Sequence, residues 1–70
     1  MGSTWIPVSL VRRGDMILEE DRLVLVVGLE EIDGGTTRIT VLAGGGTHII
    51  LRRMGTYVYG RKVAELVVGR

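Results

Sequence analysis

Cysteine is absent from this chain of 70 residues, so neither a disulfide nor a thiolate metal site can form. The chain has one histidine, His48, which cannot build a histidine-based metal site by itself, and it offers Ser3 and Ser9 no complete catalytic triad. The acidic residues of Glu19-Glu20-Asp21 and Glu30-Glu31 are adjacent in sequence, and neighbours on a strand point to opposite faces, so they do not converge on one cleft. We therefore expect a protein that is not an enzyme, with no catalytic residues, no metal, no cofactor and no small-molecule substrate.

Long hydrophobic runs are also absent. The longest apolar run, Leu23 to Val27, ends at Gly28 and is far shorter than the roughly 18–20 residues that cross a bilayer. The first residues lack the basic and apolar regions of a secretion signal. We expect no membrane contact and a cytoplasmic location, or one within a phage-infected cell. Arginine outnumbers lysine by 8 to 1, and asparagine and glutamine are missing, which fits a GC-rich bacterium or phage.

The short length predicts a single domain over residues 1–70 that needs help to be stable. A domain of this size buries only about 60% of the surface its unfolded chain exposes, and small domains often add a disulfide, a metal or a partner subunit. Here the first two are excluded. Apolar residues nevertheless make up 46% of the chain, and the mean hydropathy is +0.32. Self-association into a homo-oligomer is therefore the expected source of additional stability.

Charge is distributed unevenly along the chain. Residues 1–33 hold three basic and seven acidic side chains, a net charge of −4, whereas residues 34–70 hold six basic and one acidic, a net charge of +5. Such asymmetry can steer an anionic partner or favour head-to-tail pairing of two copies. Alternatively, hairpins that alternate around a barrel would intermix these charges within one chain.

Short β-forming segments recur between glycine-rich turns, which is typical of an all-β barrel or sandwich. Asp33-Gly34 favours a type I′ hairpin turn. Trp5 to Leu10 is expected as an extended lead-in that Pro7 confines to a sheet edge. We expect residues 1–4 to be a disordered end or a cloning remnant and residues 62–70 to form a strand or a helical turn. The predicted fold is a small five-stranded barrel or a strongly curved antiparallel sheet, with strands at residues 15–19, 22–29, 36–42, 48–53 and 56–61.

The segment Leu10-Val11-Arg12-Arg13-Gly14-Asp15-Met16-Ile17, followed by the valine-rich segment Arg22 to Val27, resembles the opening of SH3-like small β-barrels. Translation-protein and KOW-type barrels are similar here, and the resemblance covers about residues 8–42. It implies a small barrel whose relatives bind RNA or DNA or assemble with protein partners. Neither use follows from the fold alone.

The segment Arg22 to Leu29 is apolar on both of its predicted faces. Leu23, Leu25, Val27 and Leu29 alternate with Val24 and Val26. A strand that is apolar on both faces is usually covered on both faces, and a small barrel has only one interior. We therefore expect either the chain's own tail or a second subunit to cover the outside, with Val24 and Val26 as oligomer contacts.

One predicted sheet face carries the candidate binding residues. If Ile49, Leu51 and Val58 point inward, the opposite face gathers tyrosine, arginine and histidine side chains, together with Thr40. Aromatic rings stack on bases and guanidinium groups bind phosphates, so this face suits single-stranded nucleic acid. Tyrosine and arginine are also enriched at protein–protein contacts, and the sequence pI of 8.3 lies below the roughly 9 typical of nucleic-acid binders. We expect a protein partner, self or other, with nucleic acid as the alternative, at Arg38, Leu42, His48, Ile50, Arg52, Tyr57, Tyr59 and Arg61.

Two short motifs are interpreted as coincidences of composition. Arg13-Gly14-Asp15 matches an integrin-binding triplet, but it lies in a turn that enters a strand. Gly44-Gly45-Gly46-Thr47 lacks the lysine and the following helix of a phosphate-binding loop, so we expect a flexible hairpin loop there.

Overall fold

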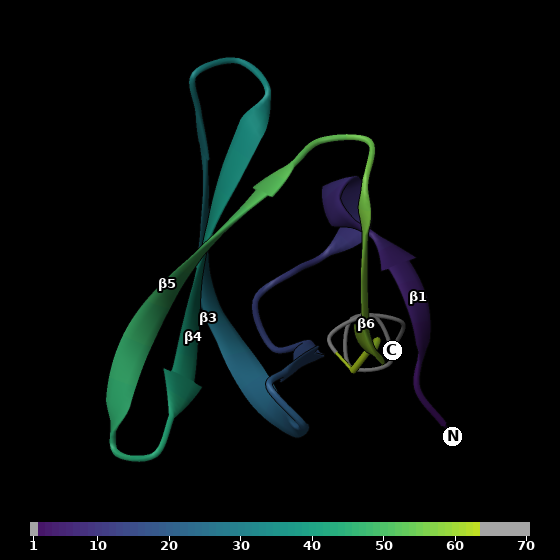
Figure 1. Cartoon of the computed structure of the whole chain (residues 1–70), viewed down its shortest axis with the longest axis vertical. Coiled ribbons are helices and arrows are strands. Elements are labelled where there is room, and N and C mark those ends of the chain that lie inside the picture. The colour runs from purple at the N-terminus through teal and green to yellow at the C-terminus, as the bar shows by residue number, and fades with distance from the viewer. Residues whose placement is uncertain (1, 64–70) are drawn as a thin grey trace.

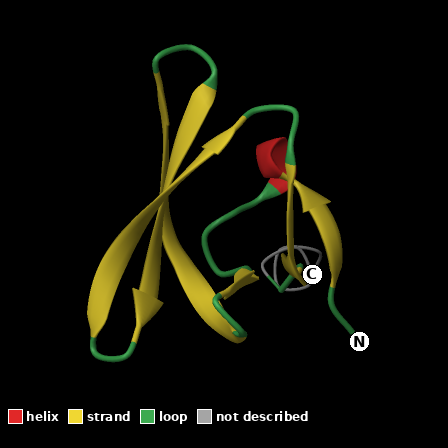
Figure 2. Ribbon diagram, viewed as in Figure 1, coloured by secondary structure: helices red, strands yellow, loops and turns green. Residues whose placement is uncertain are grey.

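The computed structural model describes residues 2–63, and within them six strands form one antiparallel sheet (Figures 1 and 2). A single turn of 3-10 helix, η1 at Val8–Leu10, follows the first strand. No helix in this part of the chain is long and apolar enough to cross a membrane. The strands are β1 (Thr4–Pro7), β2 (Met16–Glu19), β3 (Arg22–Ile32), β4 (Thr36–Ala43), β5 (Gly46–Arg53) and β6 (Tyr57–Arg61).

Hydrogen-bonded neighbours follow the order β1-β6-β2-β3-β4-β5 across the sheet. Strands β2 to β5 form a meander, and β6 returns to lie between β2 and β1. The sheet is strongly curved and its two ends do not pair with each other, as Figure 1 shows. The prediction of a strongly curved antiparallel sheet is therefore confirmed. The strand count is six instead of five because the lead-in pairs with β6, from Thr4 opposite Gly60 to Pro7 opposite Tyr57.

Tight turns connect the strands of the meander. Glu20 and Asp21 join β2 to β3 with φ values of 51° and 73°. Asp33 and Gly34, with φ values of 56° and 63°, open the turn between β3 and β4 as predicted. Gly44 and Gly45 also have positive φ and join β4 to β5 directly, so the expected flexible loop is a two-residue turn. These reversals need little chain, which leaves most residues for the strands.

The hydrophobic core lies on the inner, concave side of the curved sheet. Its members come from every strand and from η1, and Ile39, Ile17, Val26 and Val41 are at most 1% exposed. β6 closes on β2 through Gly60, where a Cβ atom would lie 2.8 Å from the Cα of Ile17. The complete set of buried core residues is Ile6, Val8, Val11, Ile17, Val24, Val26, Ile39, Val41, Ile50 and Val58.

A β-bulge changes which side chains of β3 face the core. The register with β4 shifts between Val26 and Gly28, so Val27 is an extra residue on the β3 side. Beyond the bulge, Leu29 pairs with Ile39 and packs against the core. The prediction that Leu29 shares a face with Leu23 is therefore wrong, because the bulge reverses the alternation.

The side assignment predicted for β5 is also wrong. Ile50 is 6% exposed and lies opposite Ile39 in the core, whereas Ile49 and Leu51 are 56% and 54% exposed. The reason is the two-residue turn, which pairs Ala43 with Gly46 and thereby fixes the register of the whole strand.

The two chain ends can be compared with prediction only in part. Thr4 already belongs to β1, and Lys62 and Val63 follow β6 outside any strand. Residues 1 and 64–70 lie outside the described residues, and so does most of the expected strand or helical turn at 62–70.

Candidate interaction surfaces

The outer, convex side of the sheet carries apolar side chains on four neighbouring strands, β2 to β5. Met16 on β2 pairs with Leu25 on β3, and Leu25 pairs with Leu42 on β4. Paired residues on neighbouring strands share one face of the sheet. Leu18 lies on the same side of β2, and Leu18 and Leu42 are 42% and 46% exposed. Together with Ile49 and Leu51 on β5, these residues form what we term the outer apolar row.

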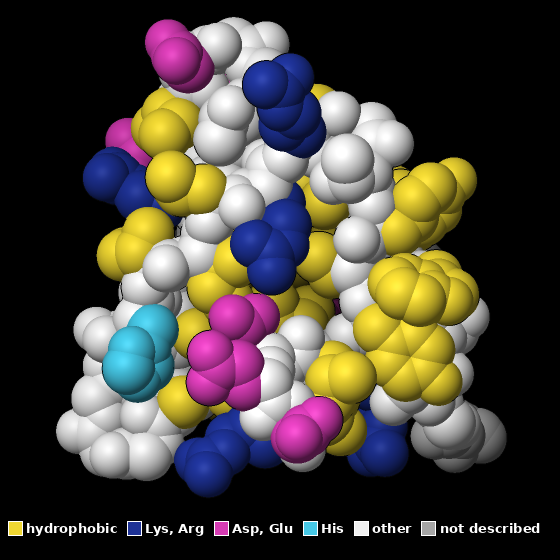
Figure 3. All heavy atoms as spheres, in the orientation of Figure 1, with side chains coloured by type: hydrophobic (Ala, Val, Ile, Leu, Met, Phe, Trp, Pro, Cys, Tyr) yellow, Lys and Arg dark blue, Asp and Glu magenta, His cyan; other side chains and the backbone are white. Residues whose placement is uncertain are grey.

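A second exposed apolar region covers β1 and β6. Trp5 pairs with Tyr59, and their rings contact edge to face with centroids 5.1 Å apart. Tyr57 lies two residues away on the same face of β6, opposite Pro7. Trp5 and Tyr57 are mostly exposed, and hydrophobic side chains gather on this side of the molecule in Figure 3. The chain has three aromatic residues in all, and this aromatic patch of Trp5, Tyr57 and Tyr59 places each of them outside the core.

The single predicted binding face does not exist as one surface. Tyr57, Tyr59 and Arg61 lie on the outer face of β6, but Arg38 and Leu42 lie on β4, and strands β2 and β3 separate β6 from β4. His48, Ile50 and Arg52 point to the inner side, because Ile50 lies in the core and alternate residues share its face. The structure thus brings the two tyrosines together and adds Trp5 to them. It separates them from the other predicted residues.

The two predicted oligomer contacts are corrected as well. Val24 and Val26 are 3% and 1% exposed and belong to the core. Their partners across the sheet, Ile17 and Val41, are core residues too. Leu23 and Leu25 occupy the outer face of β3 instead. The inference that β3 is apolar on both faces holds, but the valines are on the inside.

The uneven charge along the chain is partly neutralised within the fold. Each ion pair found among residues 2–63 joins an acid from the first half to a base from the second half. Arg38 pairs with Glu30 across β3 and β4, and Arg52 lies 3.5 Å from Glu19. Hairpin charges therefore intermix, and two of the three arginines expected to bind phosphate already have acidic neighbours.

An open cleft of about 440 Å³ lies between the β2–β3 turn and the β4–β5 hairpin. Val24, Val41 and Ile50 contribute its apolar floor, and Glu19, Glu20, Arg22 and His48 line it. Its rim thus mixes charges of both signs. No group of three or more potential metal-ligating side chains occurs among the residues that the structure describes.

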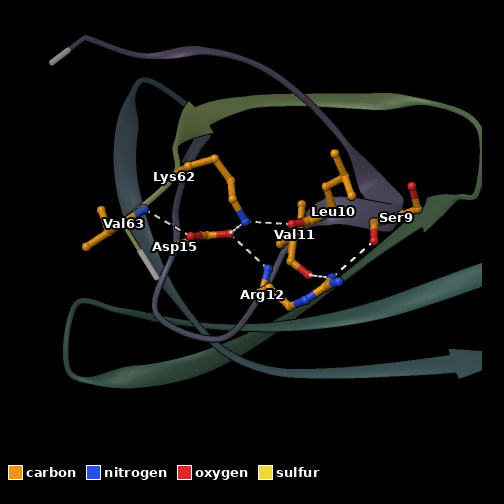
Figure 4. Close-up of polar contacts among 7 residues, drawn as sticks. All are labelled: Ser9, Leu10, Val11, Arg12, Asp15, Lys62 and Val63. Carbon is orange, nitrogen blue, oxygen red and sulfur yellow. Dashed lines mark hydrogen bonds and ion pairs between the residues drawn. The ribbon is translucent and has the colours of Figure 1, made fainter. Parts of the chain in front are cut away.

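Asp15 is the one acidic side chain buried within residues 2–63 (Figure 4). Its Oδ2 accepts hydrogen bonds from the Arg12 backbone N–H at 2.8 Å and from Lys62 Nζ at 2.7 Å. Its Oδ1 accepts the Val63 N–H at 3.0 Å, and Lys62 also donates to the Leu10 carbonyl. Asp15 thus ties the turn before β2 to the segment after β6.

Sequence reasoning did not identify this buried pair. The Gly14-Asp15 turn was a visible signal, but Lys62 lies 47 residues away, and one lysine in the sequence does not indicate its partner. Full burial of Asp15 also supports the interpretation that Arg13-Gly14-Asp15 is coincidental, because its carboxylate is not accessible to another protein.

Comparisons with protein-family models, with curated proteins and with solved structures found no match to this chain.

Proposed function

We propose that this protein is a non-catalytic binding and assembly module that works as a homo-oligomer. The observation that carries the proposal is the amount of apolar surface left outside the core. Ten large hydrophobic side chains are exposed among the described residues, including all three aromatic ones. Monomeric proteins seldom leave large apolar patches uncovered, and contiguous ones mark sites of protein contact.

The composition of the exposed surface supports a protein partner. Trp and Tyr are the residues most enriched at the centres of protein interfaces, where they supply large contact areas at low entropic cost. The outer apolar row supplies the aliphatic surface that such centres also contain. An accessory or structural role in a larger assembly fits these properties, and a second copy of the chain is the simplest partner.

Sedimentation equilibrium over a wide concentration range tests the proposal. We expect a mass that is a multiple of the 7.7 kDa chain. The double variant Tyr57→Ala, Tyr59→Ala is expected to weaken the contact in which the aromatic patch takes part while leaving the far-UV circular dichroism spectrum unchanged. The matched control is Glu31→Ala, which alters an exposed side chain away from the apolar surfaces. A monomer mass at every concentration would overturn the proposal.

A second candidate function is binding of single-stranded nucleic acid by the aromatic patch. Trp5, Tyr57 and Tyr59 offer ring surface on one face, and Arg61 follows them on β6. Each stacked base contributes about 1–3 kcal/mol, and contacts to phosphate make affinity fall as salt rises. Fluorescence titration with labelled single-stranded oligonucleotides at two salt concentrations tests this function. Absence of binding at low salt would exclude it.

We further propose that the fold is related to SH3-like barrels. The support is the Gly14-Asp15 turn that leads into β2, followed by the continuous meander from β2 to β5. Such barrels serve both protein and nucleic-acid binding, so this relationship does not choose between the two functions.

A further inference from the structure

Among residues 2–63, one side of the β5 backbone has no neighbouring strand; on that side, the Leu51 carbonyl accepts a hydrogen bond from Arg52 Nη1 at 2.8 Å. Within residues 2–63 the sheet ends at β1 on one side and at β5 on the other, and the two edges lie on opposite sides of the molecule in Figure 1. β5 is eight residues long, and six of these are exposed. An edge strand presents a row of free N–H and C=O groups that can pair with another chain.

The two edges differ in how well they are protected from such pairing. β1 has only four residues and ends at Pro7, which cannot donate a hydrogen bond. β5 has neither proline nor lysine, and its register with β4 runs without a bulge from Gly46 to Arg53. It also exposes Ile49 and Leu51. Short strands, proline, charged side chains and bulges are the usual means of blocking an edge. β5 has charges only at its C-terminal end, at Arg52 and Arg53, so the segment from Gly46 to Leu51 has none of these protections.

The backbone groups that face the open side can be assigned from the hairpin. Ala43 and Gly46 flank a two-residue turn, which makes them a hydrogen-bonded pair. Such pairs alternate along an antiparallel ladder, so every second residue from Gly46 onward directs its N–H and C=O towards β4. The N–H and C=O groups of Thr47, Ile49 and Leu51 therefore point to the open side.

We propose that β5 pairs antiparallel with β5 of a second copy, so that two six-stranded sheets join into one. This inference rests on the proposed function and names one contact surface of the assembly, which is separate from the aromatic patch. The two copies are then related by a two-fold axis that passes through the joined sheet at Ile49 or Ile50. In this arrangement the inner faces of both copies lie on one side of the joined sheet and their outer faces on the other. Ile49 then lies opposite Ile49 or Leu51 of the second copy, which covers part of the outer apolar row.

The charges of β5 select the antiparallel arrangement. Arg52 and Arg53 are its two basic residues, and both lie at its C-terminal end. Antiparallel pairing places them opposite the Gly46–His48 segment of the other copy. Parallel pairing would set arginine beside arginine, and like charges opposite each other on neighbouring strands are destabilising.

The test uses variants that distinguish the strand edge from the sheet face. Ile49→Pro removes an N–H that faces the open side, so it costs no bond to β4 but blocks pairing. Ile49→Lys keeps the N–H and sets two charges at the new interface. Leu18→Lys is the matched control, because Leu18 is similarly exposed but lies on an interior strand. Each variant is first checked for folding by circular dichroism and then analysed by sedimentation equilibrium.

We expect the edge variants to raise the dimer dissociation constant by roughly 100-fold, because Ile49→Pro removes hydrogen bonds of the new ladder in both copies and Ile49→Lys sets two like charges close together. Leu18→Lys should leave it nearly unchanged. If Leu18→Lys dissociates the dimer and the edge variants do not, the inference is overturned while the proposed assembly function stands. If the wild-type protein is a monomer at all concentrations, both are overturned.

Single-cysteine cross-linking keeps the inference testable if the proline variant does not fold. The chain has no native cysteine, so Ile49→Cys introduces the only thiol. Oxidation, or a short bis-maleimide reagent, should link two copies through this position. Thr4→Cys on the opposite edge is the control and should give only collisional background. Equal cross-linking of both variants would overturn the inference.

Discussion

The buried Asp15–Lys62 pair gives the sharpest prediction about stability. Asp15→Ala removes the acceptor of two backbone N–H groups and of the Lys62 ammonium group, at distances between 2.7 and 3.0 Å. Breaking a buried ion pair by removing one partner costs about 3–5 kcal/mol. We expect a loss near the lower end of this range, because the Lys62 side chain is 22% exposed and retains its bond to the Leu10 carbonyl.

Such a loss is large for a domain of 70 residues. At roughly 0.05–0.15 kcal/mol per residue, its total stability is about 4–10 kcal/mol. The assay is urea-induced unfolding followed by far-UV circular dichroism, at protein concentrations low enough to limit association. The double-mutant cycle of Asp15→Ala with Lys62→Ala should give a coupling energy of about 1–3 kcal/mol. Glu31→Ala is the control and should change stability by less than about 0.5 kcal/mol. A loss below about 1 kcal/mol for Asp15→Ala would refute the reasoning.

Three further experiments test the packing and the contact surface. Gly60→Ala should lower the melting temperature strongly, because its methyl group would collide with the β2 backbone, whereas Gly46→Ala has open space and should be tolerated; equal melting temperatures would contradict this. Ile39→Ala should cost about 2–5 kcal/mol in denaturant unfolding, while Ile49→Ala, on the opposite face of the next strand, should cost far less in dilute solution. Trp5 fluorescence should be readily quenched by acrylamide at low protein concentration and less so at high concentration if association covers the aromatic patch; concentration-independent quenching would show that this patch is not the contact.

Sequence patterns predicted the strands well where polar and apolar residues alternate cleanly. In β4, Thr37, Ile39 and Val41 alternate with Arg38, Thr40 and Leu42 in the sequence, and the structure buries the first three. The Asp33-Gly34 turn was equally clear, because its residue types tolerate the positive φ values that the turn requires. The residue types within these elements determine their conformation, so they can be predicted without knowing which distant segments of the chain pair with them.

The alternation of polar and apolar residues did not predict the inner face of a strand where several apolar residues are consecutive. In β5, the run from Ile49 to Leu51 is apolar at three consecutive positions, so the alternation is compatible with either face pointing inward. The register of the β4–β5 hairpin settles the choice, and that register depends on the turn at Gly44-Gly45. In β3 the bulge at Val27 reverses the alternation, which no periodic pattern reveals. The predicted binding face shares the β5 error, because it depends on which face that strand presents. Val24 and Val26 precede the bulge, and they were assigned to the outside because β3 is apolar on both faces.

The pairing of β1 with β6 has a consequence for how the protein acquires its structure during synthesis. A nascent chain emerges with its N-terminus first, yet Trp5 and Ile6 have no neighbouring strand until Val58 and Tyr59 have been made. Asp15 likewise waits for Lys62, so its carboxylate stays hydrated while β2 to β5 are already present. Contacts this distant in sequence are slow to form. Strands β2 to β5 can therefore pair with their sequence neighbours as they are made, whereas β1 and the Asp15 carboxylate find their partners only after β6 and Lys62 have been made.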